Sequence, residues 1–380
     1  MLRSSHICVI PAYPLENVQL LKDRILIPYV YYRHFGDSMT IVTQKAGEYP
    51  YLSYLEGVQL HILPDGGAQS HMDAAIHYVK EHYADIDLLF LFGARLEYAE
   101  LAAQYKALRP DGLIYLKLDI NVGWANALPL DYAPYAAFLD SCDVISCEAR
   151  RLQRFLCQKW QRAIAYIPNG LYYPLYPSMP ETTYADKENL ILTVGRIGSA
   201  QKNSHILLYA YALSYLHFTS PWDLVMIGSV TPEFQEIYRV FCQEFPEIAT
   251  HVHLPGVITD KALLHSYYRR AKIFALTSQM EGGCPNVYAE AAGFGCTILT
   301  TDIDSAQDMT DGERVGRIVT NLESIPDYAK ALSALCADQP YLEHNFTAIR
   351  EYIRHYFDYE CIVQRLRLIM ESAARKREDS

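Results

Sequence analysis

The chain has 380 residues, which is too long for one ordinary hydrophobic core and predicts two domains of similar size. Hydrophobic residues make up 51% of the sequence and charged residues 20%, and no stretch approaches the roughly 18 consecutive apolar residues that indicate a membrane-spanning helix. The net charge of -11 argues against nucleic acid as the main partner, because binding to a phosphate backbone needs a basic surface.

The N-terminal residues and the cysteines indicate a cytoplasmic protein without disulfide bonds or structural zinc. Pro11 interrupts the first apolar run before a secretory signal could develop. The nine cysteines form no CxxC pair and no cluster with histidine at the spacing of zinc ligands. We therefore expect the cysteines to be small core residues.

Six short apolar runs separated by helical stretches predict a parallel, doubly wound sheet in the first half of the chain. They read HICVIPAY, SMTIVTQ, VQLHILP, LLFLFG, GLIYLKLD and DVISC. After AIAYIPNG the strand character gives way to a segment in which Pro174, Pro177 and Pro180 lie among polar residues. Because proline interrupts both strands and helices, we expect an N-terminal domain over residues 1–175 and a linker over 176–188.

A basic segment, EARRLQRFLCQKWQR, lies near the end of this first domain and runs to Arg162. Its basic residues from Arg150 onward alternate with apolar ones at near-helical spacing, which predicts an amphipathic surface helix with a solvated basic face. The alternative is that this face contacts an anionic membrane or a lipid-linked acceptor, which would place the protein peripherally at the inner face of a membrane.

The second half shows the same alternation and predicts a second α/β domain over residues 189–350. Its apolar runs are NLILTVG, WDLVMIG, HVHLPG, KIFALTS, CTILTT and RVGRIV, with helical segments such as SHILLYAYALSYL between them. Residues 351–380 should form a C-terminal helix and tail that can cross back to the N-terminal domain. In such sheets ligands bind beyond the carboxyl ends of the strands, so the loops there are the candidate sites.

The first candidate loop is GRIGSAQKN, which follows the strand LILTV. Gly195 and Gly198 let the backbone turn sharply, and Arg196 and Lys202 converge where a diphosphate could bind. By themselves, an arginine and a lysine in such a loop are more often solvated charges than a binding site, so the weight of this candidate comes from the second loop.

The second candidate loop lies in LTSQMEGGCPNVYAEAAGFG. Pro285 beside Asn286 predicts a helix start, where unpaired backbone amides and the positive end of the helix dipole favour an anion. Glu290 would lie about one turn into this helix, where its carboxylate can accept hydrogen bonds from vicinal hydroxyls, and Glu281 precedes the loop. The alternative for Glu290 is a solvated acid in the first turn, which the dipole also favours.

At these residues the sequence resembles the retaining, nucleotide-sugar-dependent glycosyltransferases of the GT-B fold, the group that includes glycosyltransferase family 4. The resemblance is strongest over Asn189 to Val319 and rests on five elements in the family's order. They are GRIGSAQK, VMIG, HLPGVITDKALLHSYYRRA, the SxxEG and second-glutamate pair, and GCTILTT. The resemblance implies two Rossmann-like doubly wound domains that face an interdomain cleft.

The resemblance assigns the phosphates of a nucleotide-diphosphate sugar to the two candidate loops. Arg196 and Lys202 would bind the diphosphate and neutralise the departing nucleotide in place of a metal. The sugar would leave the diphosphate through an oxocarbenium-like state. The loop amides would hold the distal phosphate, around Gly283, Pro285, Asn286 and Val287. No metal and no cofactor are expected, since the nucleotide sugar is itself a substrate.

The resemblance also assigns the rest of the donor and the acceptor. Glu290 would bind the ribose hydroxyls and Glu281 the hydroxyls of the donor sugar, while the backbone near Gly256 and Val257 would contact the base. Asp119 is the candidate that orients the acceptor or the sugar, with a strand-end capping role as the alternative. The implied activity is transfer of a hexose from a UDP- or GDP-sugar to a glycan, lipid-linked or protein-linked acceptor, in the synthesis of surface polysaccharide or glycoconjugate.

The sequence departs from the family pattern at three places. Eight residues lie between Glu281 and Glu290, where seven are usual, and we expect Gly282 and Gly283 to absorb the extra residue with Glu281 still directed to the donor sugar. PAYPLENVQ replaces a glycine-rich loop near the N-terminus, and YLKLDIN replaces a strand end that often carries a histidine.

Other functions remain as alternatives. Paired aspartates bind a metal in another large glycosyltransferase fold, but the DID sequences at 85–87 and 302–304 do not fit its single-domain layout. A non-catalytic partner of an active enzyme would not bind nucleotide. A nucleotide-sugar epimerase of the same fold would change the sugar without an acceptor.

Overall fold

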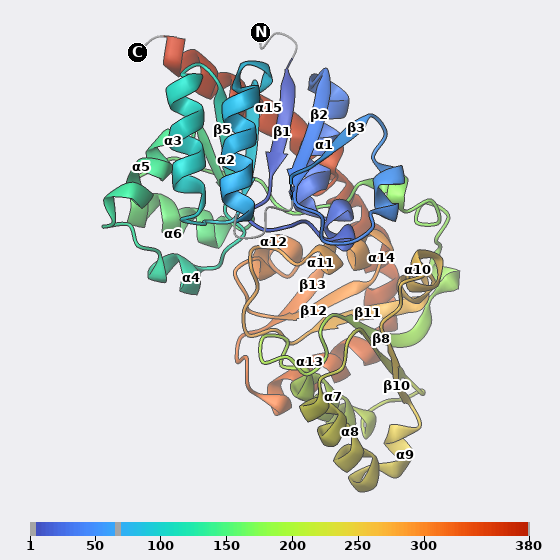
Figure 1. Ribbon diagram of the computed structural model, residues 1–380. Helices are drawn as coiled ribbons and strands as arrows, with labels where there is room; N and C mark the ends of the chain where they lie inside the picture. The colour runs from blue at the N-terminus through green and yellow to red at the C-terminus, as the bar shows by residue number, and fades with distance from the viewer. Residues whose placement is uncertain (1–4, 65–69, 379–380) are drawn as a thin grey trace. The chain divides into compact units, whose positions relative to one another are not determined.

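The computed structural model describes residues 5–64 and 70–378, which form two compact units. Unit 1 comprises Met1–Tyr172 and Tyr359–Ser380, and unit 2 comprises Tyr173–Asp358. The chain thus enters unit 2 shortly before the linker expected over 176–188, and it returns to unit 1 at Tyr359. Each unit has its own sheet (Figure 1). Each also has its own hydrophobic core.

The sheet of unit 1 has seven parallel strands in the order β3-β2-β1-β4-β5-β6-β7. The strands are β1 (His6–Ile10), β2 (Ser38–Thr43), β3 (Val58–Ile62), β4 (Leu88–Phe92), β5 (Leu113–Lys117), β6 (Val144–Cys147) and β7 (Ile164–Tyr166). Every residue of β4, β5 and β6 is buried, as the continuous apolar runs predict for strands covered on both faces.

Helices cover both faces of this sheet. They are α1 (Asp23–Phe35), α2 (His71–His82), α3 (Tyr98–Leu108), α4 (Val122–Ala127), α5 (Ala133–Ser141), α6 (Arg150–Trp160) and α15 (Tyr359–Glu378). The C-terminal helix α15 packs against α1 and β6, whereas α3 packs between α2 and α5 (Figure 1). Among the described residues, no helix is both long and apolar enough to cross a membrane.

Helix α6 has the amphipathic pattern that its sequence predicts. Leu152, Leu156 and Trp160 are buried in the core of unit 1, while Arg154 and Lys159 are exposed. Its apolar face thus packs inside the protein, and its basic residues Arg154 and Lys159 are exposed.

The sheet of unit 2 has six parallel strands in the order β10-β9-β8-β11-β12-β13. The strands are β8 (Glu188–Val194), β9 (Asp223–Ile227), β10 (Val252–Gly256), β11 (Ala271–Leu276), β12 (Thr297–Thr301) and β13 (Gly316–Val319). The helices are α7 (Ser204–Tyr215), α8 (Pro232–Glu244), α9 (Pro246–Ala249), α10 (Lys261–Arg270), α11 (Asn286–Gly293), α12 (Ala306–Met309), α13 (Ile325–Ala337) and α14 (Gln339–Tyr356). The predicted pair of doubly wound α/β domains is confirmed.

Two glycines let the ends of β8 and β9 approach closely. Gly228 follows β9 with a φ of +140°, and a Cβ added there would lie 1.7 Å from the carbonyl oxygen of Gly195, which follows β8. The backbone N–H of Gly195 donates to Ile227 O at 2.9 Å, and that of Gly228 donates to Gly256 O at 2.9 Å. The loops that leave β8, β9 and β10 therefore start from one compact edge.

A substitution at Gly228 tests this close approach. Gly228→Ala should lower the thermal midpoint of unit 2 strongly, because the added methyl group displaces a backbone carbonyl. Gly47→Ala is the matched control, since Gly47 has a similar φ of +148° but nothing within 4 Å of the added Cβ. The control should cost only local backbone strain of about 1–3 kcal/mol, and Gly228→Ala should exceed it by about 2 kcal/mol or more. Equal shifts for the two variants in scanning calorimetry would contradict the close approach.

Candidate functional site

The two candidate loops of unit 2 lie at the same edge of the sheet, because β8 and β11 are neighbouring parallel strands. The loop after β8 carries Arg196 and Lys202, and the loop after β11 carries Glu281. One backbone hydrogen bond joins the two loops, from the N–H of Gln279 to Gln201 O at 2.9 Å, and the side-chain hydroxyl of Thr277 donates to Lys202 O at 3.0 Å. Two segments about 80 residues apart in the sequence thus form one surface.

The Glu281 carboxylate is the centre of this surface. Lys202 Nζ donates to Glu281 Oε1 at 2.5 Å, Ser278 Oγ donates to the same oxygen at 2.5 Å, and Gln201 Nε2 donates to Oε2 at 2.8 Å. The side chains of Lys202 and Glu281 are 14% and 8% exposed. Glu281 is therefore turned toward Lys202 and held by three donors.

Arg196 extends this network to the solvent. Its side chain is exposed, and Nη2 donates to Gln201 Oε1 at 2.5 Å. Gln201 therefore links Arg196 to Glu281, and Arg196, Gln201, Glu281 and Lys202 form one chain of hydrogen bonds. The sequence reasoning missed Gln201, although it lies inside GRIGSAQK, because an amide carries no charge pattern.

Helix α11 begins beside this network. The positive φ in the loop falls on Gly283, at +69°, while Gly282 is not among the glycines with positive φ. Pro285 occupies the N-cap position, and no side chain caps the helix, whose first residues are Asn286 and Val287. Its first turn contains no acidic residue, so the positive end of its dipole is not offset there.

Glu290 is fixed by two tyrosine hydroxyls that the sequence reasoning did not find. Tyr176 Oη donates to Oε1 at 3.0 Å, and Tyr268 Oη donates to Oε2 at 2.9 Å. Burial, together with the Glu290 charge, raises the pKa of Tyr268, so its hydroxyl remains a donor. Tyr268 also stacks on Phe294 with ring centroids 5.9 Å apart. Each carboxylate oxygen can accept two hydrogen bonds, so Glu290 keeps capacity for a ligand.

The remaining residues predicted in unit 2 lie on neighbouring strand ends. Gly256 is the last residue of β10, with a φ of +78° and open space around its missing Cβ, and Val257 is 65% exposed. In the described part of the chain, no hydrogen bond joins Glu290, Gly256 or Val257 to Glu281.

Asp119 belongs to a separate cluster in unit 1. It follows β5 with a φ of +47°, and its backbone N–H donates to Glu148 Oε1 at 3.1 Å. The same Glu148 oxygen accepts from Lys117 Nζ at 2.7 Å, and these two side chains are fully buried. Arg24 Nη2 lies 3.6 Å from Asp119 Oδ2. Glu148 and Asp119 lie just after the neighbouring strands β6 and β5. This shared position at the strand ends is the feature of the sequence from which their contact could have been predicted.

The environment of Asp119 changes its acidity. Burial and the negative charges of Asp23 and Glu148 raise the pKa of Asp119 to about 7, against the opposing effects of Arg24 and Lys117. Burial likewise raises the pKa of Glu148. The side chain of Asp119 is still 33% exposed, so it is accessible to a ligand. Near neutral pH this carboxyl can both donate and accept a hydrogen bond.

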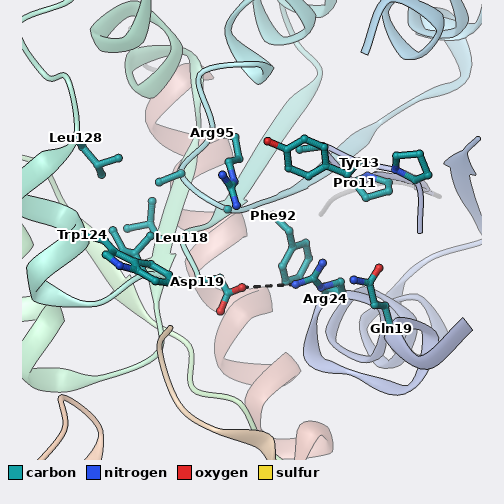
Figure 2. A pocket seen from close by; sticks show the side chains of 15 residues that line it. Pro11, Tyr13, Gln19, Arg24, Phe92, Arg95, Leu118, Asp119, Trp124 and Leu128 are labelled. Atoms are coloured by element: carbon teal, nitrogen blue, oxygen red, sulfur yellow. Dashed lines mark ion pairs between the residues drawn. The ribbon is translucent and has the colours of Figure 1, made fainter. Parts of the chain in front are cut away.

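Asp119 lines a cavity of about 520 Å³ that lies wholly within unit 1. Figure 2 shows the cavity with Asp119 facing Arg24, and with Trp124 and Tyr13 on its rim. The volume is in the range of small-molecule sites. Neither Arg24 nor Trp124 stood out in the sequence, because each lies at the start of a helix without a recognisable motif.

The structure also bears on metal binding. Among residues 5–64 and 70–378, no group of three or more His, Cys, Asp or Glu side chains is arranged to hold a metal ion. In the first DID sequence, Asp87 Oδ2 accepts the backbone N–H of His6 at 2.7 Å, which is an ordinary strand-end role.

Comparisons with known proteins agree with the motifs. Residues 188–338 match the model of the family described as Glycosyl transferases group 1. No curated protein matches the chain.

Solved structures match nearly the whole chain. Sucrose-phosphate synthase from Thermosynechococcus elongatus is 16% identical with a TM-score of 0.71, and the match covers 97% of this chain and 98% of that one. Anabaena HepE in complex with UDP and glucose is 14% identical, with a TM-score of 0.73 and coverage of 97% and 100%. The lipopolysaccharide outer core galactosyltransferase WaaB is 15% identical, with a TM-score of 0.70 and coverage of 97% and 99%. These likenesses show that the fold is GT-B.

The acidity of Asp119 predicts a pH effect on stability. The raised pKa means that the folded protein keeps this proton over a range where the unfolded chain has lost it. The stabilisation is therefore fully present below about pH 4 and is lost as the pH rises through about 7. Asp119→Asn should thus gain thermal stability relative to the wild type between about pH 5 and about pH 8. Asp111→Asn, at a side chain that is 84% exposed, is the control. Parallel pH profiles for wild type and Asp119→Asn would show that the carboxyl does not titrate in this range.

Proposed function

Because residues 188–338 match the model described as Glycosyl transferases group 1 and the chain has the GT-B fold, we propose that the protein is a retaining glycosyltransferase. It moves a hexose from a UDP- or GDP-sugar to a glycan, lipid-linked or protein-linked acceptor. The observation that carries this proposal is the chain of hydrogen bonds from Arg196 through Gln201 and Glu281 to Lys202, beside the start of α11. HepE, whose structure contains UDP and glucose, supports this class of donor.

Arg196 and Lys202 bind the diphosphate in this proposal. A guanidinium has five N–H donors and an ammonium has three, and the Gln201 and Glu281 contacts use only part of them. The pairing with Glu281 fixes Lys202 before a ligand arrives, so little reorganisation is needed when charge develops. The amides of Gly283, Asn286 and Val287, with the dipole of α11, complete the phosphate site beside Pro285.

The two glutamates bind different parts of the donor. Glu290, oriented by Tyr176 and Tyr268, accepts hydrogen bonds from the ribose hydroxyls. Glu281 binds hydroxyls of the donor sugar, and the backbone at Gly256 and Val257 contacts the base. The sugar leaves through an oxocarbenium-like state, and the fixed cations and the helix dipole stabilise the departing diphosphate without a metal.

Asp119 contributes from unit 1. Its carboxyl, one-third exposed in the cavity of unit 1, orients a hydroxyl of the acceptor or of the sugar. The exposed basic face of α6, which includes Arg154 and Lys159, would hold the protein at an anionic inner membrane surface, next to lipid-linked acceptors. This placement fits a role in the synthesis of surface polysaccharide or glycoconjugate.

Arg196 offers the cleanest test of the phosphate site, because its side chain is exposed and its removal does not strand a buried charge. Arg196→Ala should weaken binding of UDP-glucose and GDP-mannose, used as probes, by roughly one to two decades, since a hydrogen bond to a charged group contributes about 1.5–3 kcal/mol. Arg239→Ala, an exposed arginine on α8 paired with Glu236, is the control. Calorimetric affinities within twofold of wild type for Arg196→Ala would remove the assignment. No binding of either probe to the wild type would favour a non-catalytic protein.

Substitutions around Glu290 test the ribose contact. Glu290→Gln should weaken binding of UDP itself, with no sugar attached, because the proposed contact is to the ribose. Tyr268→Phe should weaken it less, since the carboxylate stays but loses one of its two positioning hydrogen bonds. Tyr238→Phe is the matched control, because it removes a hydroxyl on α8 that donates to Val252 O of β10. If UDP binds Glu290→Gln as tightly as wild type, the helix α11 assignment is wrong.

A further inference from the structure

Two arginines at the cavity of unit 1 have hydrogen-bonding capacity that the proposed function does not use. Arg95 lies in the loop after β4, and Arg24 lies at the start of α1. In Figure 2 the Arg95 side chain reaches into the cavity, and Arg24 faces it beside Asp119. Both are therefore placed to contact whatever occupies this cavity.

Arg95 is held by a ring and not by a carboxylate. Its guanidinium lies over the Tyr13 ring, 5.4 Å from the centroid, and Tyr13 Oη is in turn fixed by Glu97 Oε1 at 2.8 Å. Within the described residues, the Arg95 guanidinium makes no hydrogen bond and no ion pair. The N–H groups in the plane of the Arg95 guanidinium are therefore available to a ligand, while the face of the guanidinium packs on the Tyr13 ring.

Arg24 is also incompletely paired. Its side chain is 31% exposed, and its contact with Asp119, at 3.6 Å, is longer than a hydrogen bond. Arg24 Nε is buried without a partner in the described structure. The Glu148 carboxylate behind Asp119 is already paired with Lys117 Nζ. The cation of Arg24 is thus only partly neutralised on the side of the cavity.

Aromatic rings complete the lining of the cavity. Tyr13 and Trp124 are large side chains that stay 52% and 49% exposed at its rim. Such rings can pack against the apolar face of a sugar while leaving its hydroxyls free for polar partners such as Asp119. Aromatic rings next to guanidinium N–H groups that are available for hydrogen bonding suit a ligand that has both a sugar ring and an anionic group.

We propose that the acceptor bound by this cavity is a sugar that carries a phosphate or carboxylate group, which Arg24 and Arg95 bind. Tyr13 and Trp124 pack against the sugar ring, and Asp119 contacts its hydroxyls. The inference rests on the proposed glycosyltransferase function, because it identifies the cavity as the acceptor site. It adds the charge of the acceptor, which neither the motifs nor the fold specify.

Fluorescence of Trp124 can report binding, because Trp160 and Trp222 are buried. Glucose 6-phosphate, glucuronate and glucose serve as probes with the full-length protein, and Trp124→Phe assigns the signal. At least one of the two anionic sugars should bind about tenfold to hundredfold more tightly than glucose. Arg95→Gln and Arg24→Gln should each remove most of this preference. Arg33→Gln, on α1 but paired with Glu56, should leave it unchanged.

Two results would overturn the proposal: glucose binding as tightly as both anionic sugars, or unchanged preference in both Arg95→Gln and Arg24→Gln. UDP affinity measured on the same samples separates this failure from failure of the proposed function. If UDP binds and the anion preference is absent, only the acceptor assignment is wrong. If UDP does not bind the wild type, the glycosyltransferase proposal itself fails.

Discussion

The ion pair between Lys202 and Glu281 is the interaction on which the candidate site of unit 2 depends. It joins the loop after β8 to the loop after β11, and both side chains are largely removed from solvent. Removing one partner of such a pair leaves an uncompensated charge, which typically costs about 3–5 kcal/mol. The pair therefore fixes Gln201 and Arg196 through the same carboxylate and presents the cations in one geometry before any ligand binds.

Unit 1 repeats this arrangement with a different outcome. Lys117 at the end of β5 pairs with Glu148 after the neighbouring strand β6, as Lys202 pairs with Glu281 across β8 and β11. The pair in unit 1 is completely buried beside Asp119, whose pKa is raised by burial and by the charges of Asp23 and Glu148 and is lowered by Lys117. The pair in unit 2 stays partly exposed, which suits a cation that contacts a ligand. Parallel sheets place side chains from neighbouring strand ends together in both units, and the depth of burial separates the two roles.

The fold was predictable because its signals are local. Continuous apolar runs such as LLFLF gave the buried strands, and Pro285 with Asn286 gave the start of α11. The charged residues of unit 2 could be proposed from motifs, but their pairing could not, since 79 residues separate Lys202 from Glu281. The hydrogen bonds from Tyr176 and Tyr268 to Glu290 were missed for the same reason. Helical periodicity can indicate that Tyr268 is buried, but only tertiary packing decides which group its hydroxyl contacts. The acidity of Asp119 depends on its burial and on the charges of Asp23 and Glu148, which only the folded chain brings near.

The proposed activity of this GT-B protein is transfer of a hexose from a nucleotide sugar with retention of configuration. Proton NMR of the reaction of UDP-glucose or GDP-mannose with glucose 6-phosphate or glucuronate, in the presence of EDTA, follows donor and product together. The account predicts release of the nucleoside diphosphate and a new anomeric signal with the coupling constant of the donor's configuration. A product of inverted configuration would contradict the retaining mechanism. An epimerised sugar without acceptor would contradict the transferase function, and a reaction that appears only after magnesium or manganese is restored would contradict the role given to Arg196 and Lys202.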